Sequence, residues 1–353
     1  MTVSSVSMKE QWSALDVCKF LFALLLICAH YASERGGFPP LLDLGFSLYI
    51  LAVPFFFACS GFLFFRKYRI EDGASQKKRL KKYCIRIAKM YLAWSAIYFV
   101  FVLGDWAVNG VTQQQIIGYL HKCLVFSTYS TIWFLPALIV GVVITCVLSS
   151  RLRVGQLVVV ALVFYALGCL DKSYSFIAVN NEFLSGVYSA YDRLFFTARN
   201  GVFNAFPFVT LGYLLAARYD DFLQEGPRRS LLLFFVFLCL LIGECLVLKL
   251  VFHNSDENTT LMLIPCTWFL MKFLLLVRIP QRKIFVSMRK MSTLLFVSQR
   301  LYLSAIPSIC AGYAYVITIN PYLGLFIVLL STLATSWVIS HCAKYSKMIS
   351  WLC

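Results

Sequence analysis

The chain has few charged residues: only 14% of its 353 residues are Asp, Glu, Lys or Arg. A soluble domain carries roughly 25% charged residues, so this chain has too little polar surface to remain in water. In contrast, 60% of its residues are hydrophobic and the mean hydropathy is +0.78. Apolar runs of about twenty residues, the length that crosses a bilayer as a helix, recur from end to end. The composition therefore predicts an integral membrane protein.

The sequence also lacks the common motifs of soluble enzymes and of metal sites. It contains no Walker loop, no Rossmann glycine pattern, no HExxH and no GxSxG. Its 13 Cys form no CxxC pair and no Cys/His spacing typical of zinc. Most of them lie inside apolar runs, which is typical of small buried hydrophobic residues. We therefore expect no metal site.

The apolar runs predict an all-α, polytopic membrane protein with ten transmembrane helices. The expected spans cover residues 14–33, 44–65, 87–104, 131–150, 154–171, 200–217, 231–253, 261–278, 292–316 and 320–340. The first run follows a short start containing Lys9 and resembles a signal peptide, but nine further spans follow, so we expect an uncleaved first helix. No connection is long enough for a soluble catalytic domain. Residues 1–353 are therefore expected to form a single ten-helix domain.

The distribution of basic residues predicts the orientation in the membrane. The net charge of +16 is compatible with nucleic-acid binding, but the basic residues lie in short connections between apolar runs. If the amino terminus is cytoplasmic, most of them fall inside, with the densest group in the connection at 66–86. The outer connections then hold only Arg35, Lys122, Lys172, Arg193 and Arg199. Because cytoplasmic loops carry the excess of Lys and Arg, we predict that both termini are cytoplasmic. We also predict that the protein lies in the cell membrane, surrounded by lipid, and has no nucleic-acid partner.

The first predicted span carries three polar residues that a bilayer disfavours, at about 3 kcal/mol for each charge. Asp16 lies one turn before Lys19 and is expected to pair with it. Lys19 and His30 share one helix face, roughly 16 Å apart. Lys19 alone is typical of a snorkelling anchor. His30 has two interpretations of equal weight: a hydrogen-bonded structural histidine, or a general base that takes a proton from a hydroxyl group.

Other polar residues have similar alternatives. Glu244 and Arg300 lie deeper in their predicted spans, either as structural charges or as part of a functional path. The basic run 77–82 is typical of a solvated inner loop, although it also suits a multiply phosphorylated anion. Aromatic residues of the outer stretch 172–199 are explained by an interfacial belt, with a sugar-binding site as the minority interpretation.

Five segments together resemble the membrane acyltransferase type 3 family. The first is the acidic residue, basic residue and histidine of 16–30, and the second is the phenylalanine-rich span that ends in Ser60-Gly61-Phe62. The third is the basic pair Arg86 and Lys89 with the aromatic segment after it. The last two are Trp133-Phe134-Leu135-Pro136, and Ala198-Arg199-Asn200-Gly201 with Phe206-Pro207-Phe208. The number and order of spans also agree, so the resemblance covers nearly the whole chain. The segments AVPFFF (52–57) and ARNG (198–201) are most similar to the branch of the family that contains the membrane half of vancomycin-resistance serine racemases.

The resemblance implies transfer of an acyl group, usually acetyl from acetyl-CoA, to a hydroxyl of a cell-envelope glycan or a lipid-linked acceptor. His30 would be the catalytic histidine, and Lys19, which occupies the position of a family arginine, would be the second catalytic residue. The donor's phosphates would be held by the inner basic residues Arg86, Lys89 and Lys82. The substrate-binding residues would be Trp133, Arg199, Asn200, Glu244, Gln299 and Arg300.

Two positions depart from the family pattern. Lys89 replaces the second arginine of the basic pair, which keeps the charge but loses the bidentate fork for phosphate. Gln299 stands where the family commonly has a second histidine, and an amide forms hydrogen bonds but does not exchange a proton. The competing class is a transporter, for serine or an envelope precursor, in which the intramembrane polar residues form the path.

Overall fold

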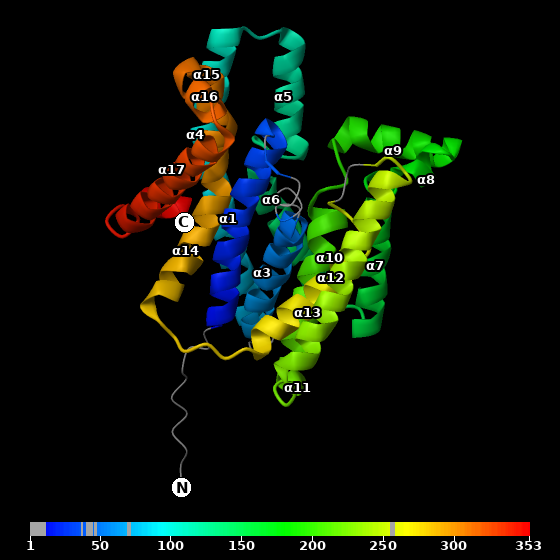
Figure 1. The fold of residues 1–353 in the computed structure, drawn as a ribbon. Coiled ribbons are helices and arrows are strands. Elements are labelled where there is room, and N and C mark those ends of the chain that lie inside the picture. The colour runs from blue at the N-terminus through cyan, green and yellow to red at the C-terminus, as the bar shows by residue number, and fades with distance from the viewer. Residues whose placement is uncertain (1–11, 37, 40–44, 46–47, 69–71, 255–257) are drawn as a thin grey trace.

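The structure is a computed structural model, and it describes residues 12–36, 38–39, 45, 48–68, 72–254 and 258–353. Within these ranges all regular structure is helical, which confirms the predicted all-α class. Seven helical stretches are long and apolar enough to cross a membrane: α1 (Ser13–Arg35), η1 with α3 (Leu48–Leu51 and Ala52–Tyr68), α4 (Gly73–Asn109), η2 with α6 (Thr131–Trp133 and Phe134–Ser149), α7 (Val154–Asp171), α12 (Pro227–Leu250) and α17 (Pro321–Cys342). The chain is therefore a multi-pass membrane protein (Figure 1).

The other three predicted spans coincide with shorter or broken helices. These are the π-helix η3 (Gly201–Ala205) with α10 (Phe206–Ala217), then α13 (Leu263–Leu276), and finally α14 (Lys283–Arg300) with the π-helix η4 (Leu301–Ala305), α15 (Ile306–Ile309) and α16 (Ala311–Thr318). The predicted start of the second span, at residue 44, lies outside the described residues. The number of ten crossings and the cytoplasmic termini stay predictions, and "inner" and "outer" below follow the predicted orientation.

Five short helices complete the described chain: α5 (Gln113–Val125), α8 (Ser175–Val179), α9 (Glu182–Phe195), α11 (Tyr219–Phe222) and η5 (Ile349–Leu352). Helices α8 and α9 lie across the outer end of the bundle (Figure 1). No residue of α9 is buried, and Phe183 and Leu194 expose large apolar side chains. Such an amphipathic helix is typical of a membrane interface.

Helix α4 corrects the predicted inner loop at 66–86. It begins at Gly73 and runs without interruption for 37 residues. Asp72 is its N-cap and accepts a hydrogen bond from the backbone N–H of Ser75 at 2.8 Å. Lys, Arg, Leu and Ala are good helix formers, so the basic character of the segment does not end the helix. The basic residues of 77–89 therefore project from a helix and not from a loop.

The ninth predicted span is not one helix over 292–316. Helix α14 begins nine residues earlier, at Lys283, and continues as the π-helix η4. At the transition the Tyr98 hydroxyl of α4 donates a 2.6 Å hydrogen bond to the carbonyl of Val297, so this acceptor is satisfied by a side chain. The helical structure is then interrupted at Cys310, whose backbone is extended (φ −130°, ψ 94°), and resumes as α16.

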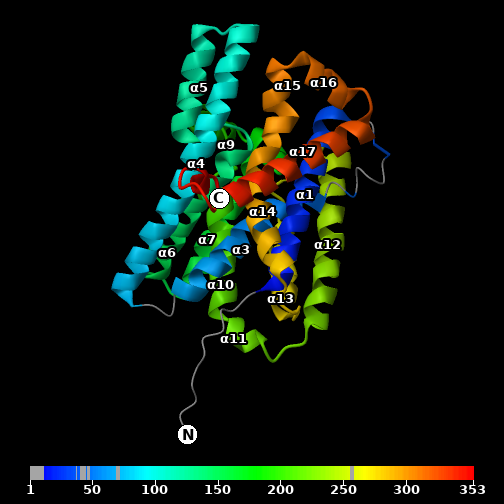
Figure 2. The same cartoon turned by 90° about the vertical axis from the view of Figure 1, so that its left-hand side faces the viewer.

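Two close helix pairs organise the core (Figure 2). Helix α1 lies beside α14, and α3 lies beside α10. The second contact depends on glycine, because a Cβ atom at Gly212 would lie 2.2 Å from the carbonyl oxygen of Ala58. A Cβ atom at Gly61 would lie 2.6 Å from the carbonyl oxygen of Val209. Small residues at such positions allow membrane helices to approach closely.

Candidate functional site

A small polar cavity surrounds His30 near the outer end of α1. It has a volume of about 140 Å³. Segments distant in the sequence contribute its lining: Leu26, His30, Tyr49, Ile50, Val53, Pro54, Ser130, Thr131, Trp133, Arg199, Asn204, Asn258, Phe296 and Arg300. Four residues selected from the sequence thus meet at one site, namely His30, Trp133, Arg199 and Arg300.

Gln299 meets His30 from behind the cavity. The Oε1 atom of Gln299 lies 2.9 Å from Nδ1 of His30, a contact between helices α14 and α1. The side chain of Gln299 is fully buried. On another side the ring of Tyr49 lies 6.1 Å from the imidazole, centroid to centroid. The imidazole is therefore held by an amide and an aromatic ring while it lines the cavity.

Two neutral polar residues in the cavity wall have unpartnered atoms. The Oγ1 atom of Thr131 and the Oδ1 atom of Asn204 are buried, and neither has a hydrogen-bond partner in the described part of the chain. Buried polar atoms are nearly always satisfied in folded proteins, so exceptions need an explanation. Because both residues line the cavity, a bound polar ligand would supply the missing partners.

Two arginines bring positive charge to the cavity. Arg300, at the end of α14, forms an ion pair with Glu34 of α1 through its Nη1 atom. Arg199 precedes the π-helix η3 and is half-buried. Both guanidinium groups are close enough to influence His30 electrostatically. The site thus combines a potential base with groups that can stabilise negative charge.

Both π-helices adjoin this cavity. Asn204 is part of η3, and Arg300 immediately precedes η4. A π-helical turn inside a longer helix is rare and is frequent at functional sites. Here the turns place Asn204 and Arg300 at the cavity wall.

Two predicted substrate-binding residues lie in other settings. The Oδ1 atom of Asn200 accepts hydrogen bonds from the backbone N–H groups of Val202 and Phe203, at 2.9 and 3.2 Å, and so caps η3. Glu244 accepts hydrogen bonds from the backbone N–H groups of Leu261 and Met262, at 2.7 and 2.9 Å. It also accepts a hydrogen bond from the Tyr174 hydroxyl. Neither Asn200 nor Glu244 lines the cavity.

The predicted pairing of Asp16 with Lys19 is wrong. Asp16 instead accepts two hydrogen bonds from Arg289 of α14, because the guanidinium fork matches both carboxylate oxygens. Lys19 lies near the Cys59 thiol on α3, close enough to act on it electrostatically. Three turns of α1 separate Lys19 from His30, so the structure does not bring Lys19 into the cavity.

The three predicted donor-binding residues share one exposed face of the inner part of α4. They occur at positions 82, 86 and 89, a spacing that repeats on one side of a helix. Arg86 lies over the ring of Tyr83 at 5.4 Å, and Lys89 lies over the ring of Trp351 at 5.0 Å. Lys82 is exposed. This basic face is separate from the cavity around His30.

Sequence reasoning missed several lining residues. Asn204 was detectable, because it is a polar residue inside the apolar run 200–217. Thr131 and Tyr49 gave no signal, since hydroxyl and aromatic residues are common near the ends of membrane helices.

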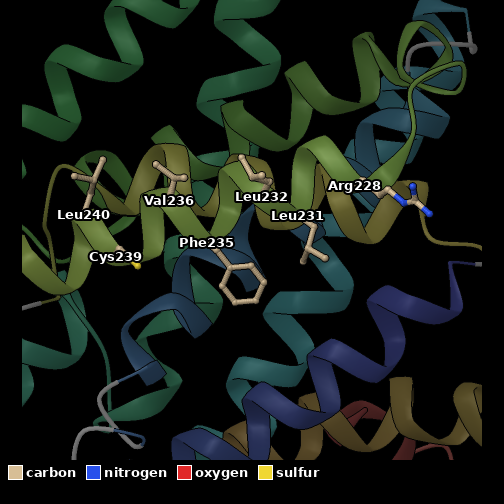
Figure 3. Close-up of a pocket in the computed structure, with 7 residues that line it drawn as sticks. All are labelled: Arg228, Leu231, Leu232, Phe235, Val236, Cys239 and Leu240. Atoms are coloured by element: carbon tan, nitrogen blue, oxygen red, sulfur yellow. The ribbon is translucent and has the colours of Figure 1, made fainter.

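A second and larger hollow, of about 690 Å³, lies along α12 (Figure 3). Its lining is apolar except for Arg228 at one end, and all of it comes from one helix: Arg228, Leu231, Leu232, Phe235, Val236, Cys239 and Leu240. No convergent polar groups meet there, so it is typical of a lipid-facing surface and not of a reactive site.

These features define a multi-pass membrane protein with a histidine-centred polar cavity between its helices. Residues 12–341 match the profile of a family described as an acyltransferase domain. The chain therefore belongs to this acyltransferase type 3 family, as its motifs predicted.

The chain is also similar to three curated proteins. Two amino-acid racemases of Enterococcus faecalis are 26% and 25% identical to it, over 75% and 78% of this chain and 36% and 39% of their own lengths. A serine/alanine racemase of Enterococcus gallinarum is 23% identical over 62% of this chain and 30% of its own length. The chain thus spans less than two fifths of these relatives. No solved structure matches the chain.

Proposed function

We propose that the chain is an integral membrane O-acyltransferase that uses His30 to move an acyl group, in the simplest case acetyl from acetyl-CoA, to a hydroxyl group. The acceptor would be a cell-envelope carbohydrate or a related lipid-linked molecule. One observation carries the proposal. In a chain of an acyltransferase family, the only titratable groups that line the polar cavity, among the described residues, are His30, Tyr49 and two arginines.

The chemistry requires one proton acceptor. A neutral His30 takes the proton of the acceptor hydroxyl while the hydroxyl oxygen attacks the thioester carbonyl carbon. The carbon–sulfur bond then breaks, and the leaving sulfur receives the proton from the imidazolium. In the covalent variant the imidazole nitrogen attacks the thioester, the carbon–sulfur bond breaks and the thiolate leaves. The acceptor hydroxyl oxygen then attacks the acyl-imidazolium, the carbon–nitrogen bond breaks, and the hydroxyl proton goes to the thiolate. Both routes return His30 to its neutral form.

The donor would approach from the cytoplasm. Its phosphate groups would be held by the basic face of α4, formed by Lys82, Arg86 and Lys89, because cationic side chains on an exposed helix suit a multiply phosphorylated anion. The acyl-bearing arm would then extend between the helices toward His30.

The acceptor would enter from the outer side. Trp133 and Arg199 would frame it, with Arg300 stabilising negative charge that develops on the reacting oxygen. A volume of about 140 Å³ corresponds to roughly four or five water molecules, at about 30 Å³ each. Such a space admits the reacting end of a glycan and not the whole chain. Gln299 would support the site through His30, and Asn200 would support it by capping η3.

The test uses the purified protein in lipid nanodiscs with acetyl-CoA labelled in the acetyl group. We expect the wild type to consume the thioester when supplied with an envelope extract, and His30→Asn to bind the donor without turnover. His341→Asn is a matched control, because His341 is exposed on α17 and stacks on Trp337 away from the cavity. Turnover by His30→Asn at the wild-type rate would refute the proposed role of His30.

Transport is the second candidate function. Two observations favour it: two π-helical breaks adjoin a small polar cavity, and the relatives are described as racemases of amino acids. Discontinuous helices around a central site are typical of transporters. Uptake of labelled serine into proteoliposomes, together with failure to bind acetyl-CoA, would favour transport over acyl transfer.

A further inference from the structure

The orientation of the Gln299 amide is fixed by its own helix. Its Nε2 atom lies 3.0 Å from the backbone carbonyl oxygen of Phe296 and donates a hydrogen bond to it. A carbonyl oxygen only accepts hydrogen bonds, so the NH₂ group must face Phe296. A reversed amide would bring two acceptor oxygens together inside the protein. The Oε1 atom of Gln299 must therefore point toward His30.

The same logic fixes the proton on the imidazole. The Oε1 atom is an acceptor, and it lies 2.9 Å from Nδ1 of His30. In a neutral imidazole one nitrogen carries a proton and the other has a lone pair. Nδ1 must then carry the proton to complete this hydrogen bond. Consequently Nε2 carries the lone pair, and it makes no hydrogen bond within the described part of the chain.

We infer that Gln299 is a positioning residue that holds His30 in the Nδ1–H tautomer, so that Nε2 is the atom that takes a proton or an acyl group in the cavity. Gln299 acts through His30 and does not itself face the cavity, since it is absent from the lining. Only the catalytic role of Nε2 rests on the proposed function. The tautomer itself is a property of the resting protein.

The surroundings leave the imidazole little freedom to adopt the other arrangement. Gln299 is fully buried, and a buried amide that lost its partner would remain unsatisfied. The ring of Tyr49 packs near the imidazole, and Arg300, the next residue after Gln299, is held by Glu34 of α1. Two successive residues, Gln299 and Arg300, thus join α14 to α1 next to the cavity.

The residue that accepts the hydrogen bond from Nδ1 of His30 is uncharged. A carboxylate would also accept from Nδ1–H, but it would add a negative charge beside the imidazole. The amide fixes the same tautomer without adding charge. We therefore assign to Gln299 an orienting role that needs no proton exchange, which explains how a glutamine can serve at this position.

The experiment is nitrogen-15 NMR of the full-length protein in lipid, labelled at histidine. The chain has four His, and His30→Asn assigns the His30 signals by their loss. In the wild type we expect a protonated Nδ1 and an unprotonated Nε2. Gln299→Met, which keeps the length but removes the acceptor, should shift His30 toward protonation at Nε2. Gln299→Glu should retain the proton at Nδ1, because a protonated carboxyl group can donate its O–H to the Phe296 carbonyl in place of the amide and still present an acceptor oxygen to His30.

Acyl-transfer activity is measured separately from the tautomer. We expect Gln299→Met to lower kcat by about 10- to 100-fold with little change in KM, a part of the roughly 10²–10⁴-fold that a positioned base supplies. An Nε2–H tautomer in the wild type, or an unchanged tautomer in Gln299→Met, would overturn the inference. If acyl transfer is absent but the expected tautomers are found, the assignment of Gln299 stands and the proposed function fails. If Gln299→Met does not fold, the wild-type and Gln299→Glu spectra decide.

Discussion

Arg289 and Asp16 form a two-point ion pair that joins the inner parts of α14 and α1. Nε of Arg289 lies 2.8 Å from Oδ1 of Asp16, and Nη2 lies 2.6 Å from Oδ2. His30 and Gln299 meet roughly three to four turns further along the same two helices. The ion pair therefore fixes the register in which the imidazole and the amide come together.

We expect Asp16→Asn to lower the free energy of unfolding by about 1–3 kcal/mol, because the substitution weakens hydrogen bonds to a charged group that is 5% exposed. Thermal unfolding in detergent measures the effect. The control is Asp220→Asn, which weakens a similar two-point pair with Arg66. The Asp220 side chain is 68% exposed, so its loss should cost at most about 1 kcal/mol. Equal losses at the two positions would contradict the proposed register role.

We expect Gly212→Ala to destabilise the protein, because the new methyl group would overlap the backbone of α3 near Ala58. Forcing such helices apart costs about 1–3 kcal/mol. Gly243→Ala is the control, since nothing lies within 4 Å of a Cβ atom at this position. That variant should be neutral or more stable by up to about 1 kcal/mol. Unfolding midpoints that do not differ between the two variants would exclude close α3–α10 packing.

We predict that Glu244 contributes to the stability of the protein and not to its activity. Its carboxylate accepts hydrogen bonds from the backbone N–H groups of Leu261 and Met262 at the start of α13. Glu244→Gln should therefore lower stability by about 1–3 kcal/mol while kcat and KM of the folded fraction stay unchanged. A large rise in KM at wild-type stability would instead support the substrate-binding role predicted from the sequence.

Hydropathy located the helices well because it measures contact with lipid. Within the described residues each predicted span coincides with helical structure, and α1 at Ser13–Arg35 differs from the predicted 14–33 only at its ends. One error is the interruption of the ninth span at Cys310, and the others occur where helices continue beyond the apolar region. Helix α4 starts at Gly73 although its first turns are basic, because helix propensity and hydropathy are independent properties.

Contacts between helices were much less predictable. Asp16 has a cationic neighbour one turn away in Lys19, yet its partner is Arg289, 273 positions further along the chain. Local spacing gives no information on such a contact. For the same reason the sequence identified Gln299 only as a departure from a family pattern and as a candidate substrate-binding residue, and not as the partner of His30. Its role follows from two distances, one to His30 and one to the carbonyl of Phe296.

The basic face of α4 predicts a donor effect that depends on salt. Arg86→Gln should raise KM for acetyl-CoA by about 3- to 10-fold, as expected for loss of about one charged hydrogen bond, with kcat little changed. The effect should weaken at high ionic strength, where exposed charges are screened. Lys283→Gln is the control, since Lys283 is an exposed inner residue on α14. An equal rise in KM for both variants would show a general effect of net charge and no donor site on α4.

The unpartnered hydroxyl of Thr131 predicts opposite effects on stability and activity. Its Oγ1 atom is buried without a partner and lines the cavity. Thr131→Val keeps the shape and removes the unsatisfied atom, so the unfolding free energy should rise by about 1 kcal/mol. If the hydroxyl binds substrate, kcat/KM should nevertheless fall by about tenfold, the equivalent of about 1.4 kcal/mol. Thr332→Val is the matched control: Thr332 is also buried, but it donates to the carbonyl of Val328 at 2.7 Å. That change should leave activity intact and add no stability. If Thr131→Val is both stabilised and fully active, the hydroxyl does not serve the substrate, and the polar wall of the cavity needs another explanation.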